Sequence, residues 1–172
     1  ERLEQFHLER PVRDLLQALL GGRGTVGRVV GQYPLKPTVY RVQFEIEGRP
    51  HFLVAKCMHP YYAQRNWLVA QRWLPAVGLA DRGPPLLGVA AARDGQAVWH
   101  LYEDLGDCRF DTATPDPKYI EAAVAVIAQL HTRFAGHPLL GECRLWGGDR
   151  GIAFYTANVN DAMRCLESLQ PP

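Results

Sequence analysis

Two periods alternate among the hydrophobic positions of this chain. Near its start, apolar residues recur at i, i+3, i+4 and i+7, the spacing of one helix face; they are Val12, Leu15, Leu16 and Leu19. Pro11 suits the first turn of this helix, and Gly21-Gly22 suits its end. The pattern therefore predicts a short helix that presents one apolar face.

The period then falls to two, which is typical of strands. Residues 28–32, 38–47 and 51–57 are rich in β-branched and aromatic side chains. Residues 33–37 are expected to separate the first two strands, and a turn at 48–50 precedes the third. In the second strand the apolar face carries Tyr40, Val42, Phe44 and Ile46, and the other face carries Val39, Arg41, Gln43, Glu45 and Glu47. Three strands with short connections predict an antiparallel meander.

A helix and two more strands complete this part of the pattern. Residues 60–74 keep helical spacing, and Gly78 ends the segment. Strands are predicted over 86–91 and 97–103, and a turn over 93–96 joins them. The order of three strands, a helix and two strands predicts an α+β fold with a five-stranded antiparallel sheet.

The last third of the chain is predicted to be helical. Asp116 and Pro117 supply the N-cap and the first-turn proline of a long helix, which residues 136–138 stop. A loop containing residues 146–148 follows, and Asn160 is expected to cap a last helix.

Composition narrows the class of protein. With 172 residues, 47% of them hydrophobic and 22% charged, the chain can bury a core as one globular domain or two small lobes. A formal net charge of +1 gives no field that would recruit nucleic acid or a membrane, so neither is expected as a partner. The sequence contains no run of about 18 apolar residues and opens with no signal peptide, so a cytoplasmic protein is expected. The four cysteines are widely spaced, which argues against a zinc site.

A lysine ends the apolar strand that begins at His51. Ammonium groups are strongly hydrated and rarely buried alone, so Lys56 either reaches solvent or meets an anion. In a small sheet that covers a nucleotide, this anion would be a phosphate. Taken alone, such a segment is more often an edge strand with a solvated lysine, so its neighbours decide between the two interpretations.

Two further segments accompany this element order. The fifth strand ends with Leu101-Tyr102-Glu103-Asp104-Leu105-Gly106-Asp107, and the long helix closes with Ala128-Gln129-Leu130-His131-Thr132-Arg133-Phe134-Ala135-Gly136-His137-Pro138. Together these features resemble the aminoglycoside phosphotransferase and choline kinase-like family. The resemblance covers nearly the whole chain but only the N-terminal half of such an enzyme. It implies a protein-kinase-like fold, with residues 1–103 as the nucleotide-binding small lobe and residues 104–172 as the hinge and the first helices of a large lobe whose remainder is absent.

The resemblance also implies roles for individual residues. Lys56 takes the place of the third-strand lysine that holds the α- and β-phosphates of the nucleotide. Val54 would lie against the adenine ring, and Tyr102 would limit the depth of the pocket. The Glu103 carbonyl and the Leu105 N–H would pair with the adenine edge.

The sequence departs from the family pattern around this site. The loop between the first two strands lacks the glycines of G-x-G-x-x-G, and Thr38 is its only hydroxyl near the second strand, so Thr38 is the candidate nucleotide contact there. Residues 61–74 contain no acidic residue, and Asn66 or Trp67 occupies the place of the family's lysine-pairing glutamate. Residues 104–106 look like the metal-binding D-F-G, but no catalytic loop precedes them, so Asp104 is expected to be structural or solvated.

The largest departure is that no His-x-Asp occurs and that no acidic residue lies five positions before an asparagine. The chain alone therefore cannot assemble a site for phosphoryl transfer, and no catalytic or metal-binding residue is expected in it.

The expected function is the nucleotide-binding half of an ATP-dependent small-molecule kinase that phosphorylates a hydroxyl of an aminoglycoside, choline-like alcohol or sugar. Its cofactor would be ATP or another nucleoside triphosphate with Mg²⁺, and the metal site would lie in the absent half. The alternatives are a catalytically silent pseudokinase or binding module of the same fold, and an unrelated α+β domain.

Overall fold

The computed structural model of the protein describes residues 10–20, 26–106, 116–148 and 151–168. The chain packs as two units, Glu1–Thr132 and Arg133–Pro172. In its described residues the first unit contains a β-sheet with helices, and the second contains helices alone. None of the described helices is both long and apolar enough to cross a membrane.

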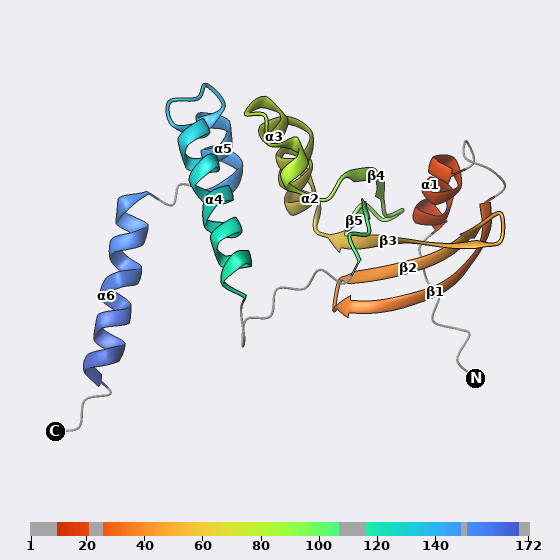
Figure 1. Cartoon of the computed structure of the whole chain (residues 1–172), viewed down its shortest axis with the longest axis horizontal. Coiled ribbons are helices and arrows are strands. Elements are labelled where there is room, and N and C mark those ends of the chain that lie inside the picture. The colour runs from red at the N-terminus through yellow and green to blue at the C-terminus, as the bar shows by residue number, and fades with distance from the viewer. Residues whose placement is uncertain (1–9, 21–25, 107–115, 149–150, 169–172) are drawn as a thin grey trace. The chain divides into compact units, whose positions relative to one another are not determined.

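The sheet has five strands, in the order β1-β2-β3-β5-β4, and every neighbouring pair is antiparallel (Figure 1). The strands are β1 Val26–Lys36, β2 Val39–Ile46, β3 Arg49–Met58, β4 Leu86–Ala91 and β5 Val98–Glu103. The predicted α+β class and the five-stranded antiparallel sheet are therefore confirmed. The strand that carries Lys56 lies at the centre of the sheet, between β2 and β5.

The connection between the first two strands was predicted wrongly. β1 continues to Lys36, and only Pro37 and Thr38 form the turn. Pro34 pairs with Tyr40 within the strand. β1 is an edge strand, which tolerates proline because an N–H on its outer side has no partner to lose.

One face of the sheet forms the main core with helix α1, Arg10–Leu20. The helix predicted near the start of the chain is thus confirmed. Apolar side chains from three strands and this helix are buried together: Val12, Leu16, Val42, Phe44, Leu53, Ala55, Trp99 and Leu101. A Cβ atom on Gly88 would lie only 3.0 Å from Leu19 Cδ1, so the absence of a side chain there lets α1 approach β4 closely. We call this side of the sheet the core face.

Helix α2, Pro60–Leu68, lies on the opposite face. Side chains alternate along a strand, so Met58 and Lys56 point away from the core-face residue Ala55. Asn66 Nδ2 of α2 lies 2.9 Å from Met58 Sδ, and α2 also contacts β5. Helix α2 therefore packs on the sheet.

The helix predicted over 60–74 changes its winding partway. After α2 the chain makes a π-helical segment, η1 Val69–Trp73, and a last turn, α3 Leu74–Ala76. Gly78, with a φ of 67°, ends the segment as expected, because glycine adopts this left-handed conformation without strain. A short 3₁₀ turn, η2 Ala80–Arg82, then leads toward β4.

The β4–β5 turn and the start of helix α4 agree with the predictions from the sequence. In the β4–β5 turn, Gly95 has a φ of 72°, as the predicted turn requires. Helix α4, Pro117–Phe134, begins at the expected place, and the Lys118 N–H donates to Asp116 Oδ1 over 2.9 Å. The N-cap prediction for Asp116 is confirmed.

The helices of the second unit were predicted less well. Helix α5, Leu140–Gly147, was not expected, and Gly148, with a φ of 79°, follows it. Helix α6 spans Ile152–Ser168, so the prediction that Asn160 caps the last helix is wrong. A cap belongs to the first turn, where the Phe154 N–H donates to the Gly151 carbonyl over 3.0 Å, whereas Asn160 lies mid-helix.

Candidate functional site

The candidate site lies on the sheet face opposite the core face, where β3 is paired on both sides. Val54 and Lys56 of β3 lie opposite Tyr102 and His100 of β5. On the other side, β2 residues Arg41 and Val39 lie opposite the same two β3 residues. Residues directly opposite one another share a face of the sheet. We define the lysine face by these side chains: Val39, Arg41, Val54, Lys56, His100 and Tyr102.

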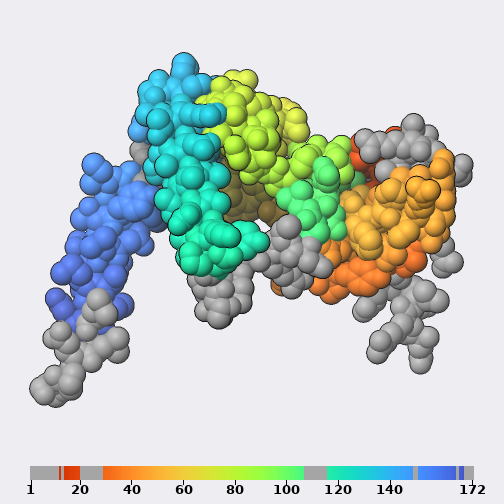
Figure 2. Space-filling model, in the orientation of Figure 1, coloured from red at the N-terminus to blue at the C-terminus, as the bar shows by residue number. Residues whose placement is uncertain are grey.

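The predicted nucleotide contacts lie on β3, on β5 or just after β5, except Thr38, which lies in the turn before β2. The Thr38 carbonyl accepts a hydrogen bond from the Cys57 N–H over 2.8 Å, which places the β1–β2 turn beside the end of β3. Glu103 pairs with Leu53 at the last position of β5, and Leu105 follows as an exposed residue. Figure 2 shows β2 and β3, in orange, next to β5, in green, as one continuous surface.

His100 is the most unusual residue of the lysine face. It is a buried polar residue, 1% exposed, and its Nδ1 lies 3.0 Å from the Tyr102 hydroxyl. Its Nε2 is buried and has no hydrogen-bond partner among the described residues. Burial, and secondarily the positive charge of Lys56, lower the pKa of His100 to about 4, so the ring is neutral at pH 7. Burial also raises the pKa of Tyr102, whose hydroxyl therefore stays protonated.

Lys56 is half-buried, and among the described residues it has no carboxylate within ion-pair distance. Residues 61–74 could supply none, because they contain no acid. Asn66, a candidate for the glutamate position, instead directs its amide nitrogen to Met58. Trp67, the other candidate, is 41% exposed. No carboxylate from another described segment replaces the missing ion pair.

An ion pair links β2 to the segment after β5. Arg41 Nε lies 2.9 Å from Asp104 Oδ2, and Arg41 Nη2 donates to Asp104 Oδ1 over 3.1 Å. The same Oδ1 accepts the Gly106 N–H over 3.1 Å. Both side chains are largely shielded, at 21% and 10% exposed. Asp104 therefore has a structural role, one of the two that the sequence predicted.

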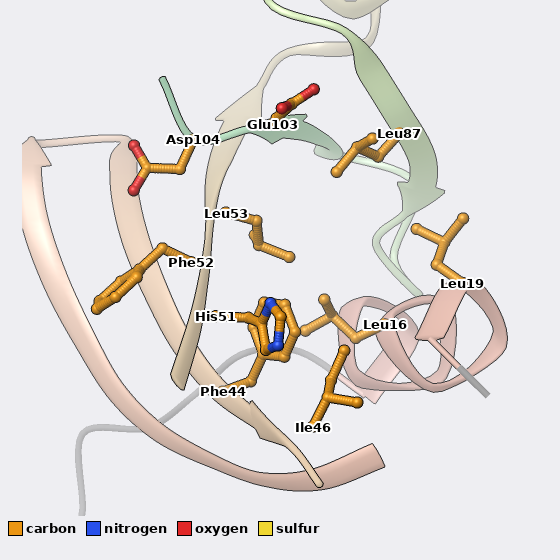
Figure 3. Close-up of a pocket in the computed structure, with 10 residues that line it drawn as sticks. All are labelled: Leu16, Leu19, Phe44, Ile46, His51, Phe52, Leu53, Leu87, Glu103 and Asp104. Carbon is orange, nitrogen blue, oxygen red and sulfur yellow. The ribbon is translucent and has the colours of Figure 1, made fainter. Parts of the chain in front are cut away.

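A cavity of about 680 Å³ lies on the core face, beside α1 (Figure 3). Leu16 and Leu19 of α1 line it together with apolar residues of the sheet. Figure 3 shows Phe52 and Asp104 on the other side of β3 from Leu53, at the edge of this space. Of the predicted nucleotide contacts, only Glu103 lines the cavity. A nucleotide held by Lys56 would therefore occupy the lysine face and not this cavity.

Two functional candidates, His100 and Arg41, were not predicted from the sequence. Each owes its importance to a residue far away in the chain, Asp104 for Arg41 and Lys56 for His100, and sequence alone does not show which residues come together. A partial signal existed for His100, which lies two positions before Tyr102 in a strand and so shares its face.

The described residues do not bring together three side chains that could hold a metal ion, so Mg²⁺ is not assigned to them. Cys57, Cys143 and Cys165 form no disulfide, and Cys108 lies outside the described residues.

Comparison with protein-family models, curated proteins and solved structures found no match for this chain.

Proposed function

We propose that this chain is the nucleotide-binding half of an ATP-dependent small-molecule kinase. The observation that carries the proposal is the register of β3 with β5, in which Val54 lies opposite Tyr102 and Lys56 lies two residues further on the same face. The strand order, with the lysine strand between β2 and β5, supports a protein-kinase-like small lobe. The reaction would transfer a phosphoryl group to a hydroxyl of an aminoglycoside, a choline-like alcohol or a sugar.

In this proposal each group has a separate task. The purine packs on Val54, and Tyr102 closes the site behind it. The purine edge meets the Glu103 carbonyl and the Leu105 N–H, which lie at the end of β5 and just after it. Two residues along a strand span about 7 Å, so the Lys56 ammonium is displaced from the base toward the phosphates, beside the Thr38 turn. Mg²⁺ and the groups that activate the alcohol would come from the remainder of the large lobe.

A pseudokinase or binding module of the same fold is the second candidate. The observation that favours it is that Lys56 has no carboxylate partner among the described residues, while residues 61–74 contain no acid. In an active kinase of the proposed kind, such a carboxylate orients the lysine. A binding module would retain the nucleotide contacts of the lysine face without supporting phosphoryl transfer.

Titration with a fluorescent ATP analogue tests the proposal. Lys56→Ala should weaken binding about tenfold or more, because a hydrogen bond to a charged group contributes about 1.5–3 kcal/mol. Lys118→Ala is the matched control, since Lys118 is exposed at the start of α4 and should leave the affinity unchanged. Absence of saturable binding, or equal binding by wild type and Lys56→Ala, would exclude a nucleotide site at this face.

A further inference from the structure

Two polar groups on the lysine face lack partners among the described residues. Lys56 is half-buried, and its ammonium group makes neither a hydrogen bond nor an ion pair there. An ammonium group carries three donors, and shielding it from water without acceptors is costly. Nearby, the buried Nε2 of His100 also has no hydrogen-bond partner. Each group could supply what the other lacks.

The sheet register holds the two residues next to each other. Lys56 and His100 are directly opposite in the antiparallel pair of β3 and β5, so their Cβ atoms are about 4.5–5.5 Å apart. Lysine is flexible, so its ammonium can reach the neighbouring ring by rotation about side-chain bonds. The ring itself is held by burial and by the 3.0 Å contact from Nδ1 to the Tyr102 hydroxyl.

We propose that neutral His100 is the positioning residue of Lys56. In this arrangement Nδ1–H donates to the Tyr102 oxygen, and the lone pair on Nε2 accepts a hydrogen bond from the Lys56 ammonium. His100 thereby holds the lysine head at the lysine face when no anion is bound. The inference rests on the proposed function only for the identity of that anion, the phosphates of a nucleotide.

A neutral acceptor has a different consequence from a carboxylate. It orients the ammonium without cancelling its charge, so the full positive charge remains for an arriving phosphate. The ring remains neutral above about pH 5, because burial and Lys56 lower the pKa of His100 to about 4. The Tyr102 hydroxyl beside the ring is protonated, and Val89 of β4, opposite His100, is apolar, so Lys56 is the charged group that acts on the pKa of His100.

Nuclear magnetic resonance of the imidazole nitrogens tests the arrangement directly, without any nucleotide. His100 should show the tautomer protonated at Nδ1, with Nε2 shifted as a hydrogen-bond acceptor. Its titration midpoint should lie near 4 in the wild type and should rise in Lys56→Met. A ring protonated at Nε2 at neutral pH, or a midpoint that Lys56→Met leaves unchanged, would overturn the proposal.

A pair of substitutions then separates positioning from packing. His100→Gln keeps an acceptor close to the place of Nε2, so the affinity for a fluorescent ATP analogue should stay within about threefold of wild type. His100→Leu fills the same space without an acceptor and should weaken binding about tenfold. Equal losses in the two variants, with their folds verified by circular dichroism, would mean that His100 only packs. If the wild type binds no nucleotide, the proposed function fails, while the tautomer and titration still decide the role of His100.

Discussion

His100 illustrates how strongly the surroundings of one residue determine its charge. The side chain is 1% exposed in the middle of the sheet, and the pKa of its ring is lowered to about 4 from an ordinary value of 6.5. In the unfolded chain the same ring is hydrated and far from Lys56. The two states therefore bind different numbers of protons between these two pH values, and stability must change with pH across that window.

The sign follows from which state takes up the proton. As pH falls from 6.5 toward 4, the unfolded chain protonates His100 before the folded chain does, so the free energy of unfolding decreases. The shift corresponds to at most about 3 kcal/mol. Urea unfolding from about pH 7.5 to about pH 4.5 should show this loss, and His100→Gln should remove that part of the slope. His131→Gln, at an exposed position of α4, is the control, and equal slopes in all three proteins would contradict the prediction.

At the scale of single residues, the sequence predicted the residues that act through their own position and missed those that act through a distant partner. Lys56 could be singled out because it ends an apolar strand. Arg41 was placed on the correct face of its strand, but its partner Asp104 lies 63 positions away in the chain. Pairings of this kind depend on which strands become neighbours, and that depends on the packing of the whole sheet.

Elements were predicted where one periodicity dominated. The alternation of β2 and the helical spacing of α1 each persist long enough to identify the element, and both are confirmed. The predictions failed where a single residue was given more weight than the periodicity. Pro34 suggested a loop although an edge strand tolerates it, and Asn160 suggested a cap although the apolar spacing of Ile152, Tyr155 and Val159 already begins before it.

The Arg41–Asp104 pair connects two elements, β2 and the segment after β5, across the intervening strand β3. Because both side chains are largely shielded, removing one partner leaves a poorly hydrated charge. We expect Arg41→Met or Asp104→Asn to lower the free energy of unfolding by about 1–3 kcal/mol, somewhat less than for a fully buried pair. Chemical denaturation of the two single variants and the double variant measures the coupling between the side chains.

The Arg164–Asp161 pair of α6 provides a matched control. Its side chains are 79% and 75% exposed, and its nitrogen and oxygen are 3.8 Å apart. Exposed pairs contribute little because water and salt screen them, so Arg164→Met should change stability by less than about 0.5 kcal/mol. Similar losses in the free energy of unfolding for Arg41→Met and Arg164→Met would show that the Arg41–Asp104 pair contributes no more to stability than an exposed pair.

At the scale of the molecule, the two faces of one sheet carry different kinds of side chains. The core face buries apolar side chains against α1 and supplies stability. The lysine face carries a half-buried lysine and a neutral histidine, and the exposed residues Leu105 and Gly106 follow β5. We propose that this face binds a phosphorylated ligand, but binding and phosphoryl transfer require different groups.

Phosphoryl transfer needs a base or positioning group for the attacking hydroxyl and ligands for Mg²⁺. The sequence contains no His-x-Asp, and the described residues bring no set of metal ligands together. We therefore expect the 172-residue chain to bind a nucleotide but to release no ADP with any aminoglycoside, choline-like alcohol or sugar. A coupled assay for ADP release measures this, with Lys56→Ala as the control for contaminating kinases. Turnover that Lys56→Ala abolishes would show that the chain builds a complete active site by itself. The proposal that the Mg²⁺ ligands and the groups that activate the alcohol come from the remainder of the large lobe would then be wrong.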